Sequence, residues 1–263
     1  MFRIMCKIED MKNPLTSKLS SIGIVAILAI SSSKGQTIVN TYDLMSPIDS
    51  VYAANIELQG TVSTGNGVFT ALNSGLGLGT RLKNSQQLWF ICGYNFASEQ
   101  QNLIYQTGFI NIRHHSMLTS KLGLQIFLQS QFNSALLLTQ RNLVGFNLSR
   151  SFLGKNELQL KSAAGIFYEN EIYTEGGMDL LRANLNVNVN KNINDVIING
   201  TVYLQPDVQN LQDYRLLGEL AVALPIRENI SLEIESAMRF DSDPHLDLLP
   251  VDFSSLIGMT INL

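Results

Sequence analysis

The pair His114 and Ser116 is the arrangement in this chain best suited to nucleophilic chemistry. Residues two apart on an extended strand share a face, so the imidazole could act as a general base for the hydroxyl. Such a pair also needs a third group that orients the histidine. No Asn follows Ser116 to provide it, and the surrounding pattern places the segment at a short turn. We therefore predict a turn-capping role here and no catalytic residue.

A second candidate is the acidic segment that contains Asp241, Asp243 and Asp247. Hard cations such as Ca²⁺ prefer several carboxylates close together. The segment lacks the glycine and the closing glutamate of an EF-hand loop. We therefore predict a solvated surface loop, with no metal and no cofactor.

Gly75, Gly77 and Gly79 alternate along one extended segment instead of preceding a helix, so they do not form a phosphate-binding loop. Alternating glycines let a sheet curve, or let side chains opposite them pack closely. Cys92 lies between Phe90 and Tyr94 on an apolar face, where we expect it to act as a small hydrophobic residue.

The low content of charged residues limits the kinds of fold that can position these residues. Only 15% of the 263 residues are charged, against about 25% in an ordinary soluble domain. The polar content consists largely of Asn, Gln, Ser and Thr. The formal net charge of −4 argues against a nucleic-acid partner, which would require a basic face.

The N-terminal region has the features of an export signal. The apolar run 22–30 follows Lys12 and Lys18 and is too short for the roughly 20 residues of a membrane-spanning helix. We predict a signal peptide over residues 1–35, cleaved before Gln36, and a periplasmic N-terminal stub over 36–50. Either Met1 or Met11 is the start. Cleavage would leave Cys92 as the single cysteine, so no internal disulfide is expected.

From residue 51 to 263, apolar residues alternate at period two in twelve runs, the pattern of strands with one apolar face. In the last run, Phe253 and Ile257 share one face, while Ser254 and Gly258 share the other. Proline cannot donate to a strand ladder. The prolines beyond residue 50 all fall in the expected connections. We predict about twelve antiparallel strands.

The connections between these runs differ in length and charge. Short turns contain basic residues, namely Lys83, Lys155, Lys191 and Arg227. Longer segments at 169–179, 206–213 and 241–252 hold half of the acidic residues that follow position 35. Short turns at one end and long loops at the other are typical of an outer-membrane barrel.

Period two alone does not show which face of the sheet is inside. A secreted soluble β-sandwich or lipocalin-like barrel remains an alternative, but its polar face would normally be rich in Lys and Glu. Apolar-face aromatic residues also gather at the long-loop end, as a membrane-interface girdle would: Phe96, Tyr168, Tyr214, Phe240 and Phe253. We therefore predict an all-β, antiparallel transmembrane β-barrel in the bacterial outer membrane.

The chain after residue 35 also resembles a family of outer-membrane proteins of unknown function that includes the bacterial salt-induced outer membrane protein, in its Bacteroidetes-type form. The resemblance is carried by residues 36–40 (QTIVN), 108–114 (GFINIRH), 127–133 (FLQSQFN), 141–145 (RNLVG), 203–206 (YLQP), 213–215 (DYR) and 239–244 (RFDSDP). It implies a barrel in the outer membrane and no established activity. The terminal Leu263 departs from the aromatic residue that usually ends such barrels.

With lipid outside, the polar positions of the strands would line the lumen. The candidate lumen-lining residues are Glu57, Arg81, Arg113, Gln129, Lys161, Arg182, Arg215, Glu219, Glu233, Glu235 and Arg239. They could form a narrow channel for ions or small hydrophilic solutes, slightly favouring anions, or a network of paired charges that fills the interior. Twelve strands lie between the filled barrels of eight and the open ones of sixteen.

Three roles therefore remain open. The first is a channel, and the second is a non-conducting structural or surface-interaction barrel. The third is a lipid-acting outer-membrane enzyme that uses His114. The expected partners are outer-membrane lipids and the barrel-assembly machinery.

Overall fold

The computed structural model of the chain describes residues 2–7, 23–26, 39, 41, 44–45, 48, 51–65, 67–83, 86–153, 158–194, 196–227, 230–246 and 248–261. Twelve long strands make up most of it: β3 (Tyr52–Ser63), β4 (Phe69–Arg81), β5 (Gln87–Glu99), β6 (Asn102–Met117), β7 (Leu122–Asn133), β8 (Leu138–Leu153), β9 (Gln159–Tyr173), β10 (Gly176–Ile193), β11 (Val196–Pro206), β12 (Tyr214–Arg227), β13 (Ile230–Asp241) and β14 (Val251–Ile261). A 3₁₀ turn, η3 (Ser134–Leu136), connects β7 to β8. Among the described residues, no helix is long and apolar enough to cross a membrane.

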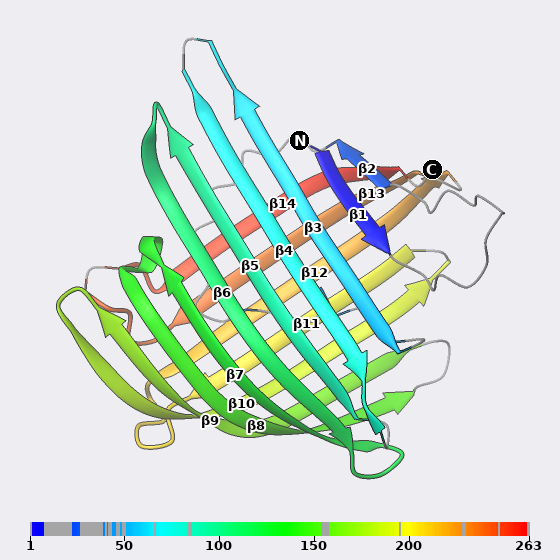
Figure 1. The fold of residues 1–263 in the computed structure, drawn as a ribbon, viewed down its shortest axis with the longest axis vertical. Helices are drawn as coiled ribbons and strands as arrows, with labels where there is room; N and C mark the ends of the chain where they lie inside the picture. The colour runs from blue at the N-terminus through cyan, green and yellow to red at the C-terminus, as the bar shows by residue number, and fades with distance from the viewer. Residues whose placement is uncertain are drawn as a thin grey trace.

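Each long strand pairs antiparallel with the next one along the chain, and the sheet closes into a barrel (Figure 1). The predicted fold of twelve antiparallel strands is confirmed. Two short strands, β1 (Phe2–Lys7) and β2 (Gly23–Ala26), lie between β3 and β14. Both belong to the segment predicted as a signal peptide. Cleavage before Gln36 stays a prediction, and it would leave β3 and β14 facing each other at the seam.

The two faces of the wall differ as the alternation predicts. On β7, Gln125 and Gln129 are each 8% exposed and point inward, whereas Ile126 and Leu128 are about half exposed and point outward. Apolar side chains are exposed on the outward face of strands all round the barrel, from Ile56 on β3 to Ile257 on β14. Because the barrel is closed, the backbone N–H and C=O groups of its wall pair with one another. The outward apolar side chains can then contact the hydrocarbon of a membrane. This architecture places the protein in the outer membrane.

The barrel has two distinct ends. We call the end where β3 begins and β14 finishes the termini end, and the opposite one the loop end. The five predicted aromatic residues lie on outward positions toward the loop end, and the Tyr214 and Phe240 rings are 5.4 Å apart. Phe96 lies beside Tyr94, with the ring centroids 6.1 Å apart. Tyrosine and phenylalanine at this level suit a membrane interface.

The predicted loop over 169–179 is wrong. Strand β9 continues to Tyr173 and β10 begins at Gly176, so residues 174–175 form a tight turn. Glu169 and Glu171 are therefore strand residues, and both are fully buried. The charge of these two residues favours an exposed loop in the sequence. In the structure, arginines from other strands neutralise both carboxylates inside the barrel. The other two predicted loops are shorter than expected, at 207–213 and 242–250.

Candidate functional site

The first feature of the lumen is a segment that does not belong to the wall. We call residues 39–48 the plug, of which Val39, Thr41, Leu44, Met45 and Ile48 are described. Leu44 and Ile48 are buried in one apolar cluster with Trp89 and Ile91 of β5, and Met45 packs beside them. Leu44, Met45 and Ile48, which belong to the segment predicted as a periplasmic stub, thus lie inside the barrel.

Glycines on β4 make room for the plug. A Cβ atom at Gly75 would lie 2.7 Å from Cδ2 of Leu44, and one at Gly77 would overlap the Leu44 carbonyl oxygen. At Gly79, a Cβ atom would lie 2.7 Å from the Trp89 ring. The alternating glycines therefore let opposing groups pack closely, and two of the three do so against the plug.

Two predicted lumen residues attach the plug to the wall through polar contacts. Arg81, at the end of β4, donates from Nη2 to the carbonyl oxygen of Ile48. Nη1 of Arg113, on β6, lies 3.7 Å from the sulfur of Met45. The plug therefore contacts β4, β5 and β6, which form one side of the barrel.

The opposite side of the lumen, along β8 to β13, holds a buried ionic cluster. Arg182 Nε and Arg215 Nη1 each lie 2.9 Å from Oε1 of Glu169, and Arg141 also pairs with this carboxylate. Glu171 lies 3.1 Å from Arg141 Nε and 3.0 Å from Arg215 Nη1. We call these five residues the arginine network.

Further carboxylates extend the arginine network toward the loop end. Arg182 Nη2 donates to both carboxylate oxygens of Asp213, each at 3.0 Å, and Arg215 Nε donates to Asp241 at 3.0 Å. Burial raises the pKa of the Asp213 carboxyl, although Arg182 acts in the opposite direction. As the pH falls, Asp213 therefore becomes protonated, and its ion pair with Arg182 weakens, at a less acidic pH than for an exposed aspartate. The contacts tie β8, β9, β10, β12 and β13 together.

The 242–250 connection covers the arginine network. The His245 ring stacks on Tyr173 with a centroid distance of 3.8 Å, and Leu248 packs against the cluster that contains Tyr173 and Leu138. The Tyr173 hydroxyl donates to Glu171 at 3.0 Å. Of the acidic residues predicted in a solvated loop, Asp241 is paired with Arg215. Asp247 lies outside the described residues. In the part of the chain that is described, no three His, Cys, Asp or Glu side chains are grouped to hold a metal ion.

Neutral amides line much of the remaining wall. Asn111 donates to Gln129 at 2.9 Å, and Gln129 donates to Gln131 at 2.5 Å. On the other side, Asn184 donates to Asn147 at 2.9 Å and accepts from Gln205 at 3.1 Å. These amides hydrogen-bond to one another, as buried polar groups usually do, although the Oδ1 atom of Asn111 has no hydrogen-bond partner among the described residues.

The structure separates the predicted lumen residues into groups. Arg182 and Arg215 belong to the arginine network, and Arg239 pairs separately with Asp252 at 2.5 Å. Glu57 accepts a hydrogen bond from Gln59 at 2.8 Å. Lys161, Glu233 and Glu235 occupy inward positions toward the termini end, and Glu219 occupies an inward position nearer the loop end of β12.

Several residues of the arginine network were missed or misplaced from sequence. Arg141 is absent from the predicted lumen residues, and Glu169 and Glu171 are predicted in a loop. Outside the network, Asp241 and Asp252 are also predicted in loops, but they are strand residues of β13 and β14 that pair with Arg215 and Arg239. The sequence does indicate that Glu169 and Glu171 belong to a strand. Both continue the inward positions of β9, while Tyr168 and Ile172 continue its apolar outward face.

His114 and Ser116 lie on the outward face of β6, near its end. Nε2 of His114 is 3.3 Å from the side-chain oxygen of Gln86, which belongs to the neighbouring connection. This contact agrees with the predicted capping role.

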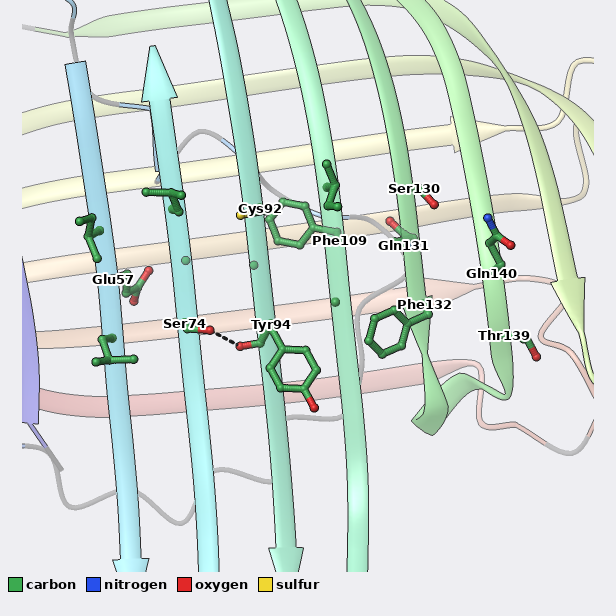
Figure 2. A pocket seen from close by; sticks show the side chains of 17 residues that line it. Glu57, Ser74, Cys92, Tyr94, Phe109, Ser130, Gln131, Phe132, Thr139 and Gln140 are labelled. Atoms are coloured by element: carbon green, nitrogen blue, oxygen red, sulfur yellow. Dashed lines mark hydrogen bonds between the residues drawn. The ribbon is translucent and has the colours of Figure 1, made fainter. Parts of the chain in front are cut away.

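A separate hollow of about 610 Å³ lies on the lipid-facing side of β3 to β8 (Figure 2). Two rows of outward residues border it: Ile56, Leu76, Cys92, Ile110 and Ser130, and Leu58, Ser74, Tyr94, Gly108 and Phe132. Backbone at Gly75 and Gly93 contributes to its floor. In a membrane this apolar hollow is filled by hydrocarbon, so it is distinct from the lumen.

A family model described as "Protein of unknown function, DUF481" matches residues 56–262, which is nearly the whole barrel. The chain belongs to this family. No curated protein matches it. The DUF481 match begins inside β3, so the plug precedes the matched region.

Solved structures similar to this DUF481 barrel include three outer-membrane proteins. The NanC porin has 12% sequence identity and a TM-score of 0.47, and the match covers 81% of this chain and 100% of the porin. The KdgM porin has 8% identity and a TM-score of 0.40, covering 81% and 99%. The β domain of the Bordetella autotransporter BrkA has 11% identity and a TM-score of 0.37, covering 80% and 97%.

Proposed function

We propose that this DUF481 barrel is a narrow outer-membrane channel for ions or small hydrophilic solutes, held closed by its own plug. The observation that carries the proposal is the seat of the plug on Gly75 and Gly77. A barrel that is closed permanently can fill its lumen with side chains of the wall. Here the wall has glycine at positions 75 and 77, and the plug fills the space that larger wall side chains would occupy.

The two sides of the lumen support different roles. Along β8 to β13, the arginine network braces the wall with contacts that are fully buried. Along β4 to β6, the described residues of the plug are held by apolar packing and by contacts from Arg81 and Arg113. Displacing the plug breaks no ion pair of the arginine network, so a passage can open on one side while the other stays braced.

The alternative is a non-conducting barrel whose loops meet a partner. The connection 242–250 favours it, because His245 and Leu248 close over the loop end. The two roles differ in conductance. A lipid-acting enzyme is the third candidate, and its test is hydrolysis that the substitution His114→Ala abolishes.

The substitution Gly77→Ala tests the channel directly. Its added methyl group overlaps the Leu44 carbonyl oxygen, and such overpacking costs about 1–3 kcal/mol. The ratio of open to plugged barrels should rise about 5- to 150-fold, because each 1.4 kcal/mol is a factor of ten. Single-channel recording in planar bilayers measures this ratio as the fraction of time spent open.

Gly200→Ala is the matched control. It adds the same methyl group inside strand β11, where the nearest neighbours are 3.8 and 3.9 Å away. Its open fraction should equal that of the unmodified protein. If Gly77→Ala folds but stays as silent as Gly200→Ala, the plug does not gate the barrel.

A further inference from the structure

The plug rests in a groove of the lumen wall. The floor of the groove is the inward row Gly75, Gly77 and Gly79 of β4, which extends for about 13 Å at roughly 3.3 Å per residue. Trp89 and Ile91 of β5 lie directly opposite Gly79 and Gly77 and form one side of the groove. We call these five residues the plug seat. Its side is apolar and buried, because Trp89 and Ile91 are at most 1% exposed.

A plug that leaves this seat opens an apolar groove to the lumen. In the plugged barrel, the Leu44 side chain lies over Gly75 and the Leu44 carbonyl oxygen lies over Gly77. Ile48 packs in the same apolar cluster. Exposing such a surface to water is unfavourable. A narrow aliphatic chain that replaced the plug on the glycine floor would therefore bind favourably.

Two hydrogen-bond donors lie at the termini end of the plug seat. Arg81 is the next inward residue of β4 after Gly79, and its Nη2 donates to the carbonyl oxygen of Ile48. Trp89, opposite Gly79, has a buried indole Nε1 with no hydrogen-bond partner among the described residues. A buried donor without an acceptor is unfavourable. This end of the seat therefore favours a ligand that brings acceptor oxygens.

A carboxylate matches the two donors. Its two oxygens can accept hydrogen bonds from Arg81 and from Trp89 at the same time. A hydrogen bond from a guanidinium to a carboxylate is also stronger than one to a neutral carbonyl oxygen. In the plugged barrel, Arg81 contacts the neutral carbonyl oxygen of Ile48. A carboxylate can therefore compete with the plug for Arg81.

We propose that the plug seat is a binding site for a linear aliphatic carboxylate, of the size of a medium-chain fatty acid, which competes with the plug and so favours the open channel. The aliphatic chain lies on the glycine floor beside Trp89 and Ile91, and the carboxylate binds Arg81. This inference rests on the proposed gating, because the seat is accessible only when the plug has left it. The ligand concentration then sets the fraction of channels that are open.

Trp89 reports binding directly, because it is the single tryptophan of the chain. The test protein is the full chain with residues 39–48 replaced by a Gly/Ser segment of equal length, folded in phosphatidylcholine vesicles. Removing the plug should shift the Trp89 emission to longer wavelength, and octanoate should shift it back with a saturable dependence on concentration. Octanamide has the same chain and a neutral head group. It should bind about two- to fivefold more weakly, the effect of one exposed ion pair.

Arg81→Gln in this open protein tests the carboxylate contact. It should weaken octanoate binding by about two- to fivefold and remove most of the difference between octanoate and octanamide. Arg227→Gln is the matched control, because it makes the same chemical change at the end of β12, outside the plug seat. It should leave both affinities unchanged. Folding of each variant is checked by heat-modifiable gel migration.

The unmodified protein tests the competition. A seated plug lowers the apparent affinity for octanoate by the fraction of time for which the seat is empty, so half-saturation should require about tenfold more octanoate, or higher, than in the open protein. In planar bilayers, octanoate should raise the fraction of time that the unmodified channel spends open. Octanamide should raise it less.

The possible outcomes separate the two proposals. The ligand inference is overturned, while the channel stands, if octanoate binds the open protein no more tightly than octanamide or if Arg81→Gln and Arg227→Gln behave alike. It is also overturned if the unmodified protein binds octanoate as tightly as the open protein. If the folded barrel without the plug conducts no ions, the channel proposal fails, together with the part of the inference that concerns opening.

Discussion

Replacing residues 39–48 by a Gly/Ser segment of the same length is expected to turn a silent barrel into a conducting one. The replacement removes Leu44 and Ile48 from their cluster with Trp89 and Ile91. Burial of one such side chain contributes about 1.5–3 kcal/mol, so losing both should shift the plugged state toward the open state by about two to four powers of ten. The measurement is single-channel recording in planar bilayers, with the replaced and unmodified proteins inserted in the same lipid.

A synthetic peptide with the sequence of residues 39–48 supplies the matching control. Added in excess to the replaced protein, it should occupy the vacated glycine seat and reduce the current. The same peptide with serine in place of Leu44 and Ile48 should have little effect. A replaced protein that folds and stays silent would contradict the gating role. It would favour the non-conducting barrel instead.

The second large effect concerns the arginine network. Glu169→Gln is expected to lower the free energy of unfolding by about 3–5 kcal/mol, the loss that follows when one partner of a buried ion pair is removed. Glu169 is contacted by Arg141, Arg182 and Arg215. A neutral amide in its place leaves three buried guanidinium groups around one fewer carboxylate. Urea unfolding in lipid vesicles, followed by heat-modifiable gel migration, measures the change.

Glu175→Gln is the control for this substitution. It makes the same chemical change in the exposed turn 174–175 and should stay within about 0.5 kcal/mol of the unmodified protein. The network would have no role in stability if Glu169→Gln behaved like Glu175→Gln. The plug does not touch Glu169 in any described contact, so gating and stability can be tested independently.

The fold could be predicted from sequence because each strand carries its own evidence. Period-two alternation identifies the lipid-facing residues locally, and in an antiparallel barrel each strand pairs with its neighbour along the chain. Leu128, Gln129 and Ser130 of β7 show this alternation directly. Strand parity also placed Arg182 and Arg215 on the inward face.

The arginine network could not be predicted because its partners come from strands that are not adjacent. Arg215 of β12 reaches Glu169 of β9 across β10 and β11. That contact depends on the tilt and closure of the whole barrel, which no local pattern specifies. Without these partners, carboxylates near a strand end suggest a loop.

The plug was missed for a different reason. Leu44 and Ile48 lie in a segment without periodicity, so nothing local indicates that they are buried. A signal did exist on the wall, because residues 88–92 (LWFIC) are apolar on both faces. Trp89 and Ile91 point inward and are at most 1% exposed. A buried inward pair of this size requires apolar side chains to pack against it.

The short connection between the plug and the wall has a consequence for how the channel responds to its surroundings. Ile48 is separated from the start of β3 by only residues 49–51, so the plug cannot diffuse away from its seat. A short tether of this kind gives an effective local concentration in the millimolar range or higher. Closing is therefore independent of how much of the protein the membrane contains. A competing peptide must reach a similar concentration before it can displace the plug.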